Sequence, residues 1–316
     1  MPLVNMLKKV SIINNIYIYM KWRERKVSYG KDNPDKIFYV IRRATCNVGL
    51  FSYVLTNMGL VKEAVEKSYI PVIDMQNNKN NYLDAEKVGK ENAWEYFFEQ
   101  PCGYSLTDTM HSHNVILSNG IITEKNDYPG HEIVNNREKR TEWKKIFNKY
   151  FLIKEDIKQE TERLYQNMFQ GEKVLGVLCR GTDYLYNHPP NHPVQPEPKN
   201  VILKATEVMR KYRCKWIYLA TEDENIYQQF YKAFGSSLKV TSAKRSSDIS
   251  HSNINDIMMR EEDDRKKIGR NYLINILLLA KCDCLVAGSV GGTYGALLLT
   301  KGYEYEYIFD LGVYGS

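Results

Sequence analysis

The sequence predicts an α/β protein with two Rossmann-like domains. In the second half of the chain, short apolar segments alternate with amphipathic segments of helical length, which is typical of a parallel, doubly wound sheet. In the first half, two apolar runs flank one segment of helical periodicity, as in a parallel β-α-β crossover. A chain of 316 residues, of which 43% are hydrophobic, is long enough to build a core in each of two domains.

The first half is expected to combine regular elements with one long irregular segment. Residues 102–135 lack a clear periodicity and are expected to form long loops, which often carry substrate contacts. The helical pattern over 142–169 is interpreted as the connection between the two domains. In order, the predicted elements are a strand over 37–42, a helix over 49–67, a strand over 69–75, a helix over 85–99 and the helix over 142–169.

The second half is expected to alternate strand and helix throughout, apart from a polar loop over 242–264. The predicted strands cover 173–179, 215–220, 237–241, 283–287 and 305–309, and the predicted helices cover 198–212, 224–234, 268–281 and 293–300. Ligands of such sheets bind at the carboxyl ends of the strands. We therefore predict the functional site in a C-terminal domain over 156–316, after an arm over 1–31 and an N-terminal domain over 32–155.

The excess positive charge lies at the N-terminus. Residues 1–31 contain seven lysines and arginines and one glutamate, so this arm accounts for the whole net charge of +6. The rest of the chain is formally neutral and gives no hint of the basic groove that a nucleic-acid-binding enzyme carries. We therefore expect no nucleic-acid partner.

The arm also has apolar residues at helical spacing. They are Leu3, Leu7, Val10, Ile13, Tyr17 and Met20. Such a helix would either lie on an anionic membrane or dock as an ordinary surface helix on the protein, and the sequence leaves both alternatives open. No apolar run approaches the roughly 20 residues that span a bilayer, and no signal peptide is visible. We expect a cytoplasmic protein, with peripheral contact at the inner face of the membrane as the first of these alternatives.

Three predicted strands of the second half end in polar or glycine-rich loops. Arg180 and Gly181 follow the first strand, and an arginine fork beside a glycine suits a diphosphate. The alternative is a structural ion pair of Arg180 with Asp183 or Asp223. The loop over 288–295 sets glycines between a strand and a helix, where backbone amides and hydroxyls can bind an anion.

Two further polar groups have two interpretations each. Asp223, with Glu222 before it, either binds a ribose or base or caps the following helix. Five prolines between 189 and 198 stiffen the loop that contains His192 and Gln195. This loop either holds those side chains in a site or is a rigid connector with solvated histidines.

The sequence predicts a site without metal or cofactor. No Asp-x-Asp tripeptide occurs, and the six cysteines lack the paired spacing of a zinc site. Arginine and helix dipoles are therefore expected to balance the charge of a leaving diphosphate.

Three segments match, in order and spacing, three motifs of one superfamily. They are residues 176–184 (GVLCRGTDY), residues 217–223 (IYLATED) and the strand, glycine-rich loop and helix over 283–299. The chain in this way resembles the fucosyltransferase superfamily, which includes α-1,2-, α-1,6- and protein O-fucosyltransferases, and glycosyltransferases of bacterial capsule and surface-polysaccharide clusters. The resemblance covers about 170–310, with a fainter echo at 47–53.

The resemblance implies a glycosyltransferase-B-like fold, an inverting and metal-independent reaction, and a cleft between an acceptor-side N-terminal domain and a donor-binding C-terminal domain. Arg180 takes the position of the arginine that holds the donor's β-phosphate, and Ser289 lies near a serine that contacts the phosphates. Loop chemistry and resemblance together give these candidate site residues: Arg180, Asp183 and His192 for catalysis; Arg180, Gly181, Thr221, Asp223, Ser289, Gly291, Gly292 and Thr293 for the donor; and Asn47 on the acceptor side.

The chain departs from the superfamily in one motif. The family's His-x-Arg-Arg is Leu178-Cys179-Arg180-Gly181 here, without the histidine that often touches the nucleotide and without the second arginine. The implied donor is GDP-fucose, and the implied acceptor is a glycan or a lipid-linked oligosaccharide. A UDP-sugar or another GDP-sugar on the same fold, and a non-catalytic nucleotide-sugar- or glycan-binding protein, stay open as alternatives.

Overall fold

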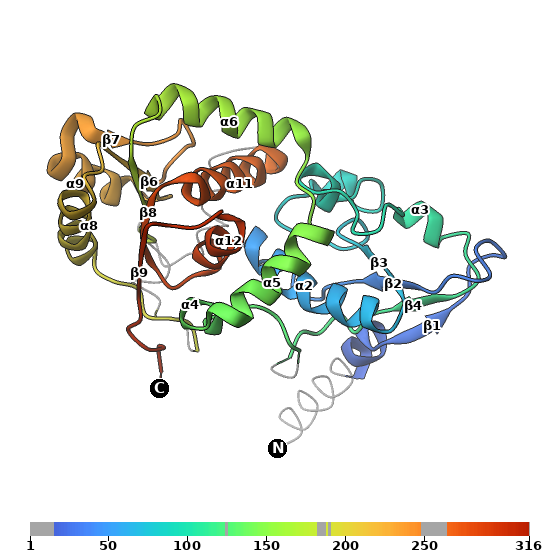
Figure 1. Ribbon diagram of the computed structural model, residues 1–316. Coiled ribbons are helices and arrows are strands. Elements are labelled where there is room, and N and C mark those ends of the chain that lie inside the picture. Colours follow the sequence, from blue (N-terminus) through green and yellow to red (C-terminus); the bar gives the residue numbers. More distant parts are fainter. Residues whose placement is uncertain (1–15, 124–125, 182–187, 189–190, 248–263, 316) are drawn as a thin grey trace, which may run out of the picture.

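The computed structural model describes residues 16–123, 126–181, 188, 191–247 and 264–315. It contains two separate β-sheets, one of four strands and one of five. Figure 1 shows the sheets in different halves of the molecule, with helices between them. The α/β class predicted from the sequence is confirmed.

The first sheet is mixed and has the strand order β1-β4-β2-β3. Its strands are β1 (Arg25–Val27), β2 (Phe38–Ile41), β3 (Ile70–Ile73) and β4 (Val115–Leu117). Strand β2 is parallel to β3 and β4, and helix α2 (Leu50–Glu66) makes the predicted crossover. Strand β1 comes from the N-terminal arm and pairs antiparallel with β4. The arm therefore contributes an edge strand to this sheet.

Two predictions for the first half are wrong. Residues 102–135, expected as loops, contain β4 and the short helices α3 (Leu106–Thr109) and α4 (Glu132–Asn135). Residues 85–99, expected as one helix, form only the 3-10 turns η1 (Ala85–Lys87) and η2 (Ala93–Tyr96). Between the turns, Gly89 has a φ of +81°, and the Asn92 side chain bonds the backbone of Ile73 and Met75 at the end of β3. These contacts outweigh the local helical preference.

The connection between the halves is two helices, where one was predicted. Helix α5 (Arg137–Tyr150) ends at Phe151, and α6 (Glu155–Phe169) begins after Lys154. The break is held by backbone hydrogen bonds between residues 152–154 and 97–99. Helix α6 then packs on α11 (Arg265–Lys281), where Arg270 binds Asp156 at 2.5 Å and Glu160 at 2.6 Å.

The second sheet is fully parallel, in the order β7-β6-β5-β8-β9. Its strands are β5 (Val174–Leu178), β6 (Trp216–Ala220), β7 (Leu238–Lys239), β8 (Cys284–Gly288) and β9 (Tyr305–Phe309), joined by α8 (Pro198–Tyr212), α9 (Glu224–Phe234), η3 (Gly235–Ser237), α11 and α12 (Gly291–Leu299). This is a doubly wound sheet, as predicted. Its order reverses beside β5, so the switch point lies between β5 and β8.

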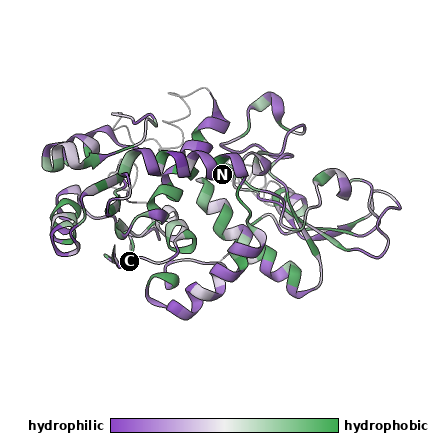
Figure 2. Ribbon diagram, turned by 45° about the horizontal axis from the view of Figure 1, so that its top comes forward, coloured by the Kyte–Doolittle hydropathy of each residue, from purple (hydrophilic) through white to green (hydrophobic). Residues whose placement is uncertain are grey.

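Alternate residues of β5 face opposite layers, because side chains of a strand point to the two faces in turn. Leu175 and Val177 belong to the core under α8 and α9, whereas Val174 and Leu178 belong to a larger core with α11 and α12. That larger core continues into α2 and the first sheet. The outer helices carry hydrophobic and hydrophilic residues together in Figure 2, as expected for helices with one face on a core.

Helices α2 and α12 form the junction between the two halves. The position where Gly295 would carry a Cβ lies 2.1 Å from the Phe51 ring, so the ring occupies the space that glycine leaves. The corresponding position at Gly291 lies 3.6 Å from Phe51, an ordinary contact. Close packing of α12 on α2 therefore depends on Gly295.

Candidate functional site

A cavity of about 120 Å³ opens at the carboxyl edge of the second sheet, beside the switch point. Leu178 and Arg180 line it after β5, and Thr221 and Glu222 line it after β6. Further walls come from α11, from the loop after β7, and from Val290 before α12. The volume is smaller than the about 300–1,000 Å³ of typical ligand pockets, so a whole nucleotide sugar would also occupy the open side of the cavity.

Arg180 is held at this cavity by an ion pair. Its Nε lies 3.6 Å from Oε1 of Glu222, and its side chain is 20% exposed. Of the two ion-pair partners considered from the sequence, Asp223 does not pair with Arg180, and Asp183 lies outside the described residues. Among the described residues, the charged members of the lining are Arg180, Glu222 and Lys244, which together carry one net positive charge.

Cys179, the residue before Arg180, is buried in the core. Burial, together with the nearby Glu222 and Asp223 carboxylates, raises the pKa of its thiol far above the usual value. It therefore stays a neutral thiol in the core under α8 and α9.

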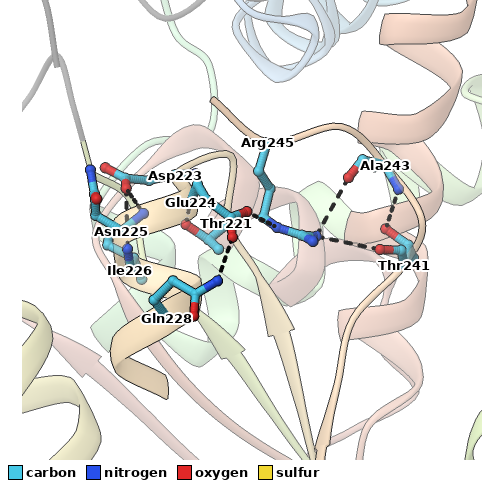
Figure 3. A network of polar contacts seen from close by, with 9 residues as sticks. All are labelled: Thr221, Asp223, Glu224, Asn225, Ile226, Gln228, Thr241, Ala243 and Arg245. Carbon is cyan, nitrogen blue, oxygen red and sulfur yellow. Dashed lines mark hydrogen bonds and ion pairs between the residues drawn. The ribbon is translucent and has the colours of Figure 1, made fainter. Parts of the chain in front are cut away.

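Asp223 caps helix α9, which was one of its two interpretations. Its Oδ1 accepts from the amides of Asn225 at 2.7 Å and Ile226 at 3.1 Å, and the side chain is buried (Figure 3). A Cβ on Gly181 would lie 2.3 Å from the other carboxylate oxygen of Asp223. Gly181 therefore permits the close approach of the β5 loop to this cap.

The network in Figure 3 fixes two walls of the cavity against each other. Arg245 donates through Nε to Glu224 at 3.1 Å and through Nη1 to the carbonyls of Thr241 and Ala243 at 3.4 Å. Its guanidinium also stacks on Tyr227, 4.4 Å from the ring centre. Because Glu224 follows the β6 loop and Ala243 lines the cavity, these contacts hold the loop after β7 beside Thr221 and Glu222.

Two helix N-termini meet the cavity. Gly49 is the N-cap of α2 and Val290 is the N-cap of α12, and neither residue caps its helix with its own side chain. Both line the same cavity as Arg180. The positive ends of two helices and one arginine thus face the same space, which suits a phosphate or diphosphate.

The side chains after β8 are directed mostly inward. Ser289 is 1% exposed, and its hydroxyl lies 2.7 Å from the hydroxyl of Tyr294. Thr293 donates to the carbonyl of Gly288 at 2.6 Å. Gly291 faces α2, and Gly292 is closely approached by Tyr272 and Leu178, so the two glycines pack α12 against its neighbours.

Two further predicted residues, Asn47 and His192, are not among the described residues that line the cavity. Asn47 is exposed in the loop that leads to Gly49. His192 is exposed, and its carbonyl accepts from the amide of Tyr314 near the C-terminus. The loop over 191–195 pairs there with residues 312–314, so it is a braced connector in this structure.

Residues of the lining that sequence reasoning missed include Tyr82, Asn271, Tyr272 and Asn275. Three of them lie on α11, and the spacing of Asn271 and Asn275 on one helix face was a signal that could have been used. Asn275 accepts from Tyr218 at 3.0 Å and Thr241 at 2.8 Å. Burial raises the pKa of Tyr82 well above its usual value, so it lines the cavity as a neutral phenol.

No metal cluster stands out in the described ranges, where no three His, Cys, Asp or Glu side chains are grouped so as to hold an ion.

The fold defined by these sheets and this cleft is of the glycosyltransferase-B type. Solved structures of fucosyltransferases are similar to it in fold. The structure of NodZ alpha-1,6-fucosyltransferase soaked with GDP-fucose matches 89% of this chain and 98% of its own, with a TM-score of 0.52 and 16% identity. Fucosyltransferase NodZ from Bradyrhizobium, as the Se-Met protein, matches 89% of this chain and 97% of its own, with a TM-score of 0.51 and 16% identity.

POFUT1 in complex with GDP matches 87% of this chain and 99% of its own, with a TM-score of 0.51 and 9% identity. At these identities the likeness shows the fold alone. No family model matches the sequence, and no curated protein sequence matches it.

Proposed function

We propose that this protein is an inverting, metal-independent glycosyltransferase that moves a sugar from a nucleotide donor, with GDP-fucose as the leading donor, to a glycan or lipid-linked oligosaccharide of a surface polysaccharide. One observation carries the proposal. Arg180 and the N-termini of α2 and α12 face one cavity at the switch point of the second sheet. Solved structures that share this fold hold GDP-fucose or GDP.

The proposed chemistry is an in-line attack of an acceptor hydroxyl on the anomeric carbon while the nucleoside diphosphate leaves. Arg180 and the amides of Gly291 and Gly292 stabilise the negative charge that develops on the diphosphate, and positioning supplies much of the remaining acceleration. Asp183 and His192 are the proposed bases. His192 is exposed and outside the cavity lining, so a base role for it needs the ligand or the loop to approach further.

The two domains, each built on one of the sheets, are proposed to bind different substrates. Residues 156–316 bind the donor, and residues 32–155, including Asn47, face the acceptor. The base and ribose are proposed to lie along α11 and the loop after β7, where Asn271 and Lys244 supply polar groups.

The melting temperature with added nucleotides tests the donor site. We expect GDP to raise the melting temperature of the full-length protein with magnesium and equally with EDTA, because a ligand at 100 times its Kd adds about 2.7 kcal/mol to stability. UDP, ADP and CMP serve as matched comparisons. If UDP and not GDP raised the melting temperature, the proposed donor would become a UDP-sugar on the same fold. If no nucleotide changed the melting temperature, the donor site would be contradicted.

A turnover assay distinguishes the proposed enzyme from the second candidate function, a non-catalytic binding protein. Release of the nucleoside diphosphate is measured for a panel of nucleotide sugars, with and without glycan acceptors. If GDP or UDP stabilised the protein but no nucleoside diphosphate were released, the protein would be a non-catalytic nucleotide-sugar-binding protein.

Exposed apolar side chains on the helix of the arm support the proposal that the arm contacts a membrane. Residues 16–22 are helical, and the five apolar or aromatic side chains 16–20 are all exposed, although Trp22 is buried. This part of the helix is not docked on the protein, and Lys21, Arg23 and Arg25 follow it. In the described residues no helix is both long and apolar enough to cross a bilayer. The proposal is therefore peripheral binding from the cytoplasmic side.

Vesicle cosedimentation tests this contact. We expect binding to vesicles with anionic headgroups and little binding to neutral phosphatidylcholine vesicles, with binding reduced at high salt because the arm's charge is screened. The variant Tyr17→Ser/Tyr19→Ser removes two exposed rings and should weaken binding further. Equal recovery with both kinds of vesicle would overturn the proposal.

A further inference from the structure

Ser289 joins three segments that are far apart in the sequence. Its carbonyl accepts from Nε2 of Gln195 at 3.0 Å, and its hydroxyl contacts Tyr294 of α12 at 2.7 Å. The same hydroxyl lies 3.0 Å from Nδ1 of His131, the residue before α4. Ser289 also directly precedes Val290, the N-cap of α12 and a wall of the cavity. The contacts that restrain Ser289 therefore also restrain Val290 and this wall of the cavity.

The other nitrogen of His131 is occupied as well. Its Nε2 lies 3.2 Å from Oδ2 of Asp310, which follows β9. A carboxylate can only accept, so Nε2 carries the hydrogen. In the neutral ring Nδ1 is then an acceptor, which means that Ser289 donates to it and Tyr294 donates to Ser289. His131 thus anchors the ends of β8 and β9 to the segment that connects the first sheet with α5.

A serine, a histidine and an aspartate in this order resemble a nucleophilic triad, but the burial argues against that chemistry. Ser289 is 1% exposed, and its hydroxyl is in contact with His131 and Tyr294, so it is not presented to solvent as a nucleophile. Its contacts instead restrain the loop between β8 and α12.

We propose that His131 is a positioning residue for the cavity: through Ser289 it holds Val290 and the first turn of α12 in the arrangement that receives the ligand's phosphates. His131 does not line the cavity itself. The effect on ligand binding rests on the proposed function, whereas the restraint on the loop does not. Without the ring, the buried hydroxyl of Ser289 loses its acceptor, and such a loss at a buried polar group is felt locally.

Two substitutions separate the two contacts of the ring. In His131→Asn the side-chain oxygen lies near the position of Nδ1 and can still accept from Ser289, whereas His131→Gln reaches the position of Nε2 and keeps only the contact with Asp310. His131→Ala removes both. His111→Ala is the matched control, because His111 is an exposed histidine beside the first sheet.

Amide hydrogen exchange of residues 289–295 and the Kd for GDP are measured on the full-length variants. We expect exchange in this segment to rise by about fivefold in His131→Ala and His131→Gln, and to stay near the unsubstituted value in His131→Asn and His111→Ala. The Kd for GDP should weaken by a similar factor in the same two variants.

Unchanged exchange in His131→Ala, or equal effects of the Asn and Gln variants, would overturn the positioning role. If the unsubstituted protein binds no nucleotide, the proposed function fails, and the exchange of residues 289–295 alone decides the role of His131. Raised exchange with an unchanged Kd for GDP would also reject the link to the cavity.

Discussion

Arg180→Ala is expected to lower kcat/KM for the nucleotide-sugar donor by about 10²–10³-fold, which is the effect of removing one preorganised donor at a developing anion. Arg180 is 20% exposed at the cavity, and among the residues that the structure describes no second arginine lines it. Steady-state release of the nucleoside diphosphate measures the effect. Arg180→Lys keeps the charge but loses the planar fork, so it should recover only part of the activity.

Arg140→Ala is the matched control for this substitution. Arg140 is also largely buried, but it binds Glu306 at 2.7 Å and two backbone carbonyls of α4, and it does not line the cavity. We expect Arg140→Ala to lower the melting temperature and to leave KM for the donor nearly unchanged. An Arg180→Ala protein with normal turnover would remove Arg180 from the mechanism.

Gly295→Ala is expected to lower the free energy of unfolding by about 3 kcal/mol, at the upper end of the usual cost of overpacking a core. The new methyl group would lie 2.1 Å from Cε1 of Phe51, which is 1% exposed and has little room to move. Within a helix, glycine to alanine normally stabilises by about 0.5–1 kcal/mol, so the sign of the change reports the clash. Urea unfolding followed by circular dichroism gives the value.

Gly291→Ala provides the comparison within the same helix. Its methyl group would meet Phe51 at 3.6 Å, an ordinary contact, so this variant should be as stable as the unsubstituted protein or slightly more stable. If both variants were equally stable, α12 would not be packed on α2 as the structure describes.

Much of the second sheet could be predicted, because its elements are local. The predicted helices over 198–212 and 224–234 and the strand over 305–309 have the observed bounds. Pro198 opens the first of these helices, and Gly235, with a φ of +52°, ends the second. Breakers of this kind act on neighbouring residues and can be read without the tertiary fold.

The first half was harder to predict because its structure depends on distant partners. Strand β4 has only three residues and takes its place between β1 and β2 through pairing alone. The helical pattern over 85–99 is overridden by Asn92, which bonds the end of β3. Neither partner is adjacent in the sequence.

The residues of the candidate site also divide into those that local sequence predicts and those that depend on the tertiary fold. The rule that ligands bind at the carboxyl edge identified Arg180 and Thr221, and both line the cavity. Tyr82 and His131 come from segments without a pattern, and only the fold brings them to this edge. The roles of all these residues in binding and catalysis stay predictions.

The pairing of β1 with β4 also bears on where the chain can be shortened. Strand β4 has β2 on its other side, so β1 is what covers its free row of amides and carbonyls. A protein that starts after residue 31 would expose Val115, Ile116 and Leu117 as an apolar edge, which is a template for pairing with another molecule. Strand β1 therefore covers an edge that is prone to pairing with another chain, and a truncation meant to remove only the exposed helix should end before Trp22, which is buried.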